Sequence, residues 1–148
     1  MREQFTEAEL RRHLRTAADE ALETMCFSPV LGPAPPQAGS EPGVLVHLGF
    51  TGDACGRLWL EMSAAAAAHA TANFLGQTEQ ETDRTQMEMV TCELANMICG
   101  NVLSRLDPYG HFDLSSPQTA VELDAPAQAV EERLALETGS LQMWIAFA

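Results

Sequence analysis

The stretch Thr85–Leu106 constrains the fold of this sequence most, because its apolar residues recur at the spacing of a helix. At about 100° per residue, they fall on one arc that a globular protein would bury. The residues on this arc are Met87, Val90, Leu94, Met97, Ile98 and Val102. Thr85 and Glu88 offer a capping box for the helix start, although 82–83 could begin it earlier. Asp107 precedes a proline and therefore marks the helix end.

The same reading assigns elements to most of the remaining sequence from capping residues and from apolar periodicity. The expected elements are a helix from Thr6 to Cys26, a hairpin with strands over 44–50 and 55–62, a helix between Ser63 and Gly76, and strands over 118–124, 132–138 and 141–147. Gly139 and Ser140 are interpreted as a two-residue turn between the last two strands. This order lacks the strict alternation of strands and helices in a parallel sheet and indicates an α+β domain.

The segment Ser28–Gly43 is rich in proline. Its composition favours an extended or disordered chain over a helix. We expect a surface loop there, and not a domain linker, because too few residues precede it to fold alone. At 148 residues, the sequence 1–148 fits a single domain that is long enough to bury most of its apolar surface.

Charge narrows the classes of partner. Acidic residues number 21 against 8 basic ones, which gives a formal charge of −13. Such a surface repels nucleic acid and anionic membranes and favours a partner with a positive patch. No lysine is present, which excludes a P-loop lysine and a Schiff-base nucleophile. The first residues lack the apolar core of a signal peptide, and the run Ala64–Ala68 is too short to span a bilayer. We therefore expect a cytoplasmic protein.

The cysteines and histidines do not show the spacing of a metal site. These residues are Cys26, Cys55, Cys92, Cys99, His13, His47, His69 and His111. Cys92 and Cys99 would lie about 10 Å apart along one helix, which is too far for a disulfide. We expect four reduced thiols and no metal bound by this chain alone.

Glu93 and Asn96 lie opposite the apolar arc of the helix, and positions three apart are neighbours on a helix surface. Together they present one carboxylate and one carboxamide. Such residues are often merely solvated. The stretch 93–101, Glu-Leu-Ala-Asn-Met-Ile-Cys-Gly-Asn, nevertheless resembles the ExxN helix of the CheC/CheX/FliY chemotaxis phosphatases, and the CheX-like members most closely.

The resemblance extends over roughly 19–147. Gly52 and Gly56 before an extended run, an alanine-rich helix ending Phe74-Leu75-Gly76, and an acidic lead into ExxN follow the order expected of that family. The resemblance implies a CheC/CheX-like domain with two pseudo-repeated halves and a largely antiparallel sheet packed by long helices.

The activity that the resemblance implies is hydrolysis of the aspartyl phosphate of a CheY-type response regulator. Mg²⁺ would be supplied by the receiver partner, and the chain would need no cofactor of its own. Phosphoryl transfer gains mainly from positioning and electrostatics. The carbonyl of Asn96 can accept from the attacking water while its NH₂ donates to a phosphoryl oxygen. Glu93 would anchor the receiver by pairing with its lysine.

Four residues around the pair are expected to complete the docking surface. Met89 and Leu103 would supply apolar contact, and Cys92 would border the pair. Gly100 costs about 1 kcal/mol in a helix and would permit close approach of the partner. Family members commonly carry Asp or Ser where this chain has Met89, which leaves open a non-catalytic CheX-like module that binds a response regulator or a flagellar switch component.

Two further interpretations concern symmetry. The segment Asp19–Cys26 can be laid on Cys92–Cys99, with Glu20 over Glu93, so the first helix is either a degenerate second site or only a cap on the core. We also expect a homodimer, from the resemblance and from the apolar strand 141–147, which could pair at a sheet edge. A structural dimeric domain that binds no receiver is the third functional alternative.

Overall fold

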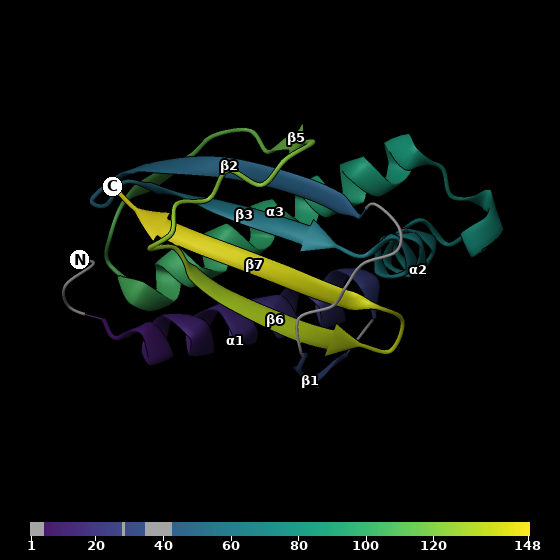
Figure 1. Ribbon diagram of the computed structural model, residues 1–148, viewed down its shortest axis with the longest axis horizontal. Helices are drawn as coiled ribbons and strands as arrows, with labels where there is room; N and C mark the ends of the chain where they lie inside the picture. Colours follow the sequence, from purple (N-terminus) through teal and green to yellow (C-terminus); the bar gives the residue numbers. More distant parts are fainter. Residues whose placement is uncertain (1–4, 28, 35–42) are drawn as a thin grey trace.

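The computed structural model describes residues 5–27, 29–34 and 43–148. The elements in chain order are α1 (Glu7–Cys26), β1 (Val30–Pro33), β2 (Val44–Gly52), β3 (Gly56–Met62), α2 (Ala64–Leu75), the 3₁₀ turn η2 (Glu79–Glu81), α3 (Arg84–Leu106), β4 (Phe112–Leu114), β5 (Gln118–Ala120), β6 (Val130–Leu136) and β7 (Ser140–Phe147). In the described part of the chain, seven strands form one antiparallel sheet, and α1 and α3 pack on one of its faces (Figure 1). The α+β prediction is confirmed.

The helices begin and end where capping residues allow it. Thr6 and Glu9 form a capping box at the start of α1, and Ser63 and Gly76 cap the two ends of α2. For α3 the earlier start is the correct one. Its capping box pairs Asp83 with Gln86, so the box expected at Thr85 and Glu88 is wrong. An Asp at the N-cap accepts from the N–H of the third helical residue, which satisfies a donor the helix leaves free.

The strands depart from expectation mainly at the sheet edges. β1 is a strand within the proline-rich segment, where only a loop is expected. It pairs antiparallel with β6 at the edge of the sheet. An edge strand tolerates proline, because the backbone N–H groups on its outer side have no neighbouring strand to bond. Residue 28 and residues 35–42 of that segment lie outside the described residues. The sequence does not predict β4, β5 is shorter than the run 118–124, and β6 begins two residues earlier than predicted.

The turn before β7 also differs from expectation. Ser140 is the first residue of β7 and pairs with Ala135, so it does not belong to the turn. Residues 137–139 join the two strands, and Gly139 has a φ of 83°. A three-residue hairpin connection commonly places a glycine in this region.

The sheet is built from two similar halves. Its strand order is β1-β6-β7-β3-β2-β4, and β5 also pairs with β2. Each half contributes a long helix followed by a short strand and later a hairpin, and the hairpins meet where β3 pairs with β7. The short strand after α1 pairs with the hairpin of the second half, and the one after α3 pairs with that of the first. The two pseudo-repeated halves are therefore confirmed.

β7 lies between β3 and β6 in this order, at the centre of the sheet. Its backbone is paired on both sides, so the dimer contact expected from an exposed edge at 141–147 is wrong. The apolar character of β7 comes instead from burial. Dimerisation itself stays a prediction that rests on the family resemblance.

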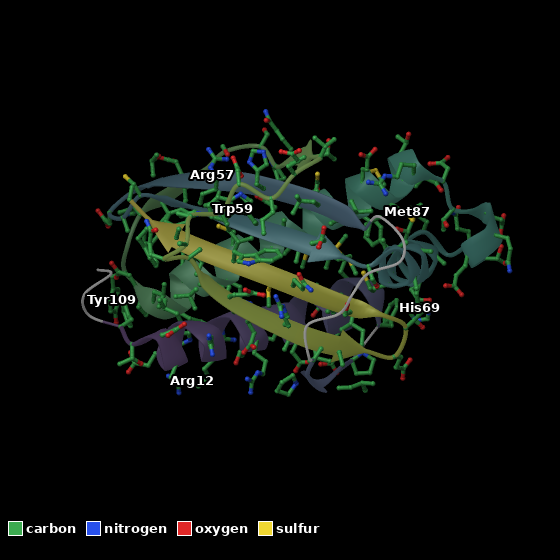
Figure 2. The ribbon with its side chains drawn as sticks, viewed as in Figure 1. Arg12, Arg57, Trp59, His69, Met87 and Tyr109 are labelled. Atoms are coloured by element: carbon green, nitrogen blue, oxygen red, sulfur yellow. The ribbon has the colours of Figure 1, made fainter. Side chains whose placement is uncertain are left out.

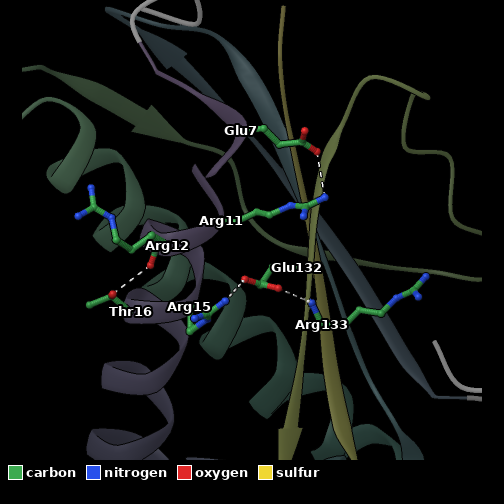
Figure 3. A network of polar contacts seen from close by, with 7 residues as sticks. All are labelled: Glu7, Arg11, Arg12, Arg15, Thr16, Glu132 and Arg133. Atoms are coloured by element: carbon green, nitrogen blue, oxygen red, sulfur yellow. Dashed lines mark hydrogen bonds and ion pairs between the residues drawn. The ribbon is translucent and has the colours of Figure 1, made fainter. Parts of the chain in front are cut away.

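The core lies between the sheet and the helices. The inward side chains of α1, α3 and the four central strands form one apolar cluster. α1 is further tied to β6 by Arg15, whose guanidinium pairs with Glu132 at 3.0 Å (Figure 3). Glu132 is 8% exposed, and a carboxylate buried to this extent needs such a partner.

The opposite face of the sheet is crossed by the segment 121–129 (Figure 1). The indole N–H of Trp59 donates to Asp124 of this segment at 2.7 Å, and this bond lowers the pKa of the Asp124 carboxyl. Trp59 is buried on that side, facing away from the helices (Figure 2). In the residues described, no helix combines the length and apolarity needed to cross a bilayer.

Candidate functional site

The outward face of α3 carries both residues of the predicted site. Val90, Leu94, Ile98 and Val102 are buried as expected, and they fix the rotation of the helix against the sheet. Glu93 and Asn96 consequently lie on the exposed side. Among the hydrogen bonds and ion pairs of the described residues, none engages the carboxylate of Glu93 or the amide of Asn96. Both groups are therefore available to a partner.

Apolar side chains flank the polar pair. Met89 is 47% exposed and Met97 is 37% exposed. The prediction that Met97 belongs to the buried arc is wrong. The residue lies at the border of the arc, where the side chains of the helix begin to face solvent. The pair Glu93 and Asn96 therefore has an exposed methionine one turn before it and another beside it. Thioether side chains adapt to irregular surfaces.

Gly100 and Cys92 complete this face, and Leu103 does not. Beyond the adjacent residues and the backbone of its own helix, a Cβ added at Gly100 would meet no atom within 4 Å, so glycine is not required there by packing within the domain. Cys92 is half-buried beside the pair. Leu103 is 1% exposed, because the last turns of α3 are flanked by α1 and β4. Its predicted place in the docking surface is therefore wrong.

Cys92 is poorly suited to act as a nucleophile. Burial, followed by the carboxylates of Glu88 and Glu93, raises the pKa of its thiol. A thiol must lose its proton to become an effective nucleophile. The thiol next to the pair therefore stays protonated at neutral pH, and covalent catalysis by this residue is disfavoured.

The four cysteines are free, and their burial predicts an order of alkylation. Burial raises the pKa of Cys26 to about 11 and that of Cys99 to about 12, whereas Cys55 is exposed. With iodoacetamide at pH 8, we expect Cys55 to react first, Cys92 more slowly, and the other two only on unfolding. Peptide mass mapping of timed samples measures this order, and early modification of Cys99 would contradict it.

α1 repeats the burial pattern of α3 residue by residue. From Asp19 to Cys26 the sequence of half-buried, exposed and buried positions is identical to that from Cys92 to Cys99. Glu20 thus corresponds to Glu93, and Glu23 stands where Asn96 provides an amide. The two-fold arrangement of the halves gives this correspondence a structural basis.

The carboxylate of Glu20 is already engaged by α3. Asn101 donates to it at 2.8 Å, and Arg105 also hydrogen-bonds to it. The bond from Asn101, together with that from Arg105, lowers the pKa of the Glu20 carboxyl. The face of α1 therefore lacks the amide, and its counterpart of Glu93 is not free, so α3 is the one helix that presents a complete pair in the described residues.

Comparison with known proteins identifies the family. Residues 44–139, more than half of the chain, match the profile of chemotaxis phosphatase CheX. The chain belongs to the CheX family. Its recognised region contains both Glu93 and Asn96. Comparison with curated protein sequences gives no match.

Solved structures of CheX proteins share this fold. CheX from Vibrio vulnificus superposes with a TM-score of 0.77 at 18% identity, covering 97% of this chain and 99% of that one. CheX from Desulfovibrio desulfuricans gives 0.72 at 17% identity, with 95% and 99% covered. The CheX-CheY-BeF3-Mg+2 complex from Borrelia burgdorferi gives 0.67 at 18% identity, with 92% and 96% covered.

The site is an exposed helix face and not a cavity. A cavity of about 730 Å³ lies elsewhere, between the ends of β2, β3 and β7 and the loops around Ser115 and Gln128. The described residues contain no cluster of three or more metal-ligating side chains. A flat surface with one acid, one amide and two methionines is suited to a protein partner.

Proposed function

We propose that this CheX-family chain accelerates hydrolysis of the aspartyl phosphate of a CheY-type response regulator. The observation that carries the proposal is the unengaged pair Glu93 and Asn96 on the exposed face of α3, in a chain of a family described as a chemotaxis phosphatase. The named complex of a Borrelia burgdorferi CheX with CheY, BeF3 and Mg²⁺ supports the choice of partner, since beryllium fluoride stands in for a phosphoryl group.

Asn96 orients the attacking water in this proposal. Its carbonyl oxygen accepts a hydrogen bond from the water, and its NH₂ donates to a phosphoryl oxygen. The water oxygen bonds to phosphorus as the bond to the aspartyl oxygen breaks. The aspartate is left as its carboxylate, and inorganic phosphate leaves with both protons of the water, as H₂PO₄⁻. This reaction gains chiefly from positioning and charge stabilisation. It requires no nucleophile from the chain, which agrees with the protonated Cys92.

Mg²⁺ belongs to the receiver in this scheme. Glu93 is a single carboxylate on an open surface, and the described residues offer no ligand cluster around it. When bound by the receiver, the ion neutralises charge on the phosphoryl oxygens. This chain then contributes the anchoring acid and the amide.

The function is tested by timing phosphate loss from purified CheY-type receivers. Each receiver is phosphorylated with acetyl phosphate, freed of the donor, and followed with and without this chain in Mg²⁺ buffer. We expect faster loss for at least one receiver. If no receiver is accelerated, the proposal is overturned. Binding without acceleration would indicate the non-catalytic module. This module is kept as the alternative because Met89 is exposed at a position that is commonly polar in the family.

Glu93→Gln tests the anchoring role. The substitution keeps the size of the side chain and removes the charge that would pair with the receiver's lysine. We expect the receiver Kd to rise on the order of ten-fold, equivalent to about 1.4 kcal/mol. The wild-type affinity should also weaken with added salt more steeply than that of the variant. Titration calorimetry at two salt concentrations measures both effects, and an unchanged Kd would exclude the ion pair.

A further inference from the structure

Phe27 is an aromatic residue with a backbone conformation that is unfavourable for it and a side chain that is exposed to solvent. It caps α1 in the left-handed region, with φ 52° and ψ 34°, where a side chain is disfavoured and glycine is usual. α2 ends in the same region with Gly76. Phe27 is also 75% exposed, so burial in the core does not offset the cost. An outlier of this kind points to a use of the residue.

A second exposed phenylalanine lies at the end of α2. Phe74 is 42% exposed, and the preceding residue, Asn73, donates through its side chain to the carbonyl oxygen of Cys26 at 2.9 Å. Cys26 in turn precedes Phe27. Phe27 and Phe74 therefore each come directly after one partner of this hydrogen bond. The bond holds the ends of α1 and α2 together.

α2 leads from the sheet to the start of α3. The start of α2 is tied to the sheet, because the backbone N–H of Ser140 donates to the hydroxyl of Ser63 at 3.1 Å. Its far end reaches α3, where Gln77 donates to Gln86 at 2.8 Å. α2 is seen nearly end-on in the view onto the sheet (Figure 1). It thus leads away from the sheet past the ends of α1 and α3.

Phe27 lies level with the predicted pair. α1 and α3 run in opposite directions (Figure 1), and Glu20 of α1 bonds to Asn101 of α3. Phe27 is seven residues beyond Glu20, about 10 Å along the helix. Because the two helices are antiparallel, the corresponding position on α3 is seven residues before Asn101. That position lies in the turn of α3 that contains Glu93 and Asn96. The exposed end of α1 therefore adjoins the outward face of α3.

We propose that Phe27 and Phe74 extend the docking face of α3 as an apolar rim, which contacts an apolar strip on the same CheY-type receiver. This inference rests on the proposed function. In this proposal the rim adds aromatic contact to that of the exposed methionines of α3, and such contact often carries much of the affinity of an interface.

Charge favours a receiver over a second copy of this chain as the occupant of the rim. Glu23 and Glu93 are exposed on the adjoining helix faces, and the chain has a net charge of −13. Two copies meeting through this face would bring like charges together. A receiver that carries a lysine beside its phosphorylated aspartate brings the opposite charge.

The rim is tested with Phe27→Gly and Phe74→Ala, singly and together. The probe is the receiver that the wild-type chain dephosphorylates, loaded with beryllium fluoride and Mg²⁺ and titrated in a calorimeter. We expect each single substitution to raise Kd about five-fold or more. The rate at saturating phosphorylated receiver should change little, because the amide of Asn96 is intact, so KM should rise without a matching fall in kcat.

Stability separates this role from a structural one. Glycine suits the left-handed cap at position 27 and alanine suits a helix at position 74, so the Tm should not fall markedly. The matched control is Tyr109→Ala, which truncates an aromatic residue that is 93% exposed. Figure 2 shows Tyr109 at the end of the molecule opposite to His69 of α2. Its Kd for the receiver should equal that of the wild type.

The outcomes distinguish the two proposals. If the wild type accelerates dephosphorylation and the folded double variant binds the receiver equally well, the rim is overturned and the function stands. If the double variant loses only self-association in sedimentation, a second copy is the occupant and the rim proposal is likewise overturned. If the wild type accelerates no receiver, the function fails, and the rim falls with it.

Discussion

Asn96→Ala is expected to reduce the accelerated dephosphorylation on the order of 10²-fold or more, the scale observed when one preorganised polar group is removed from a site. Binding of the beryllium fluoride form of the receiver should stay close to wild type. A group that acts only in the transition state lowers turnover without weakening the ground-state complex. Single-turnover decay of the phosphorylated receiver, measured at several concentrations of the chain, separates these two quantities.

Two further variants sharpen this experiment. Asn96→Asp keeps the size of the side chain but replaces the NH₂ donor with a charge that repels the phosphoryl group, so it should be at least as slow as alanine. Gln128→Ala removes an exposed amide from the segment on the opposite face of the sheet and should change nothing. Alanine is the better helix former at position 96, so a fall in Tm cannot explain the loss. Wild-type rates in Asn96→Ala would refute the role of the amide.

The helices could be predicted from the sequence because their signals are local. Thr6, Ser63 and Gly76 set helix ends through hydrogen bonds and backbone preferences within a few residues. Even the error at α3 was local, since Asp83 competes with Thr85 for the same capping role. Such signals do not depend on where the rest of the chain lies.

The edge strands were harder because partners far along the sequence decide them. β1 forms through pairing with β6, a hundred residues away in the chain, despite a proline within it. β4 is too short to show alternation and exists through its pairing with β2. β7 illustrates the same limit, since an apolar run fits a central strand and an exposed edge equally well. The sequence alone did not distinguish the two.

The sequence predicts the exposure of the central pair, Glu93 and Asn96, better than that of the residues around it. Glu93 and Asn96 lie far from the buried arc, so a small error in helix rotation could not hide them. Met97 and Leu103 lie nearer to its boundary, where neighbouring elements decide exposure. Leu103 is covered at the end of α3 and Met97 is not. Phe27 gave no periodic signal at all, because its exposure and conformation follow from the end of α1.

Gly100→Leu should separate folding from docking. The position is open, because a Cβ added there would meet no atom within 4 Å beyond the adjacent residues and the backbone of its own helix. We therefore expect the isolated domain to accept a larger side chain. Replacing glycine within a helix by a good helix former gains about 1 kcal/mol. For a chain of this size, Tm should rise by about 2–4 °C. Thermal unfolding followed by circular dichroism measures this shift.

Docking should change in the opposite direction. A leucine at position 100 projects from the face that the partner must approach, one turn after Asn96. Overpacking of a fitted contact typically costs about 1–3 kcal/mol, which corresponds to roughly a 5- to 150-fold rise in Kd. Gly100→Ala should give a smaller effect in both assays. Because the same substitution stabilises the domain and weakens the complex, a variant that bound and dephosphorylated the receiver like the wild type would show that the partner does not approach this turn of α3.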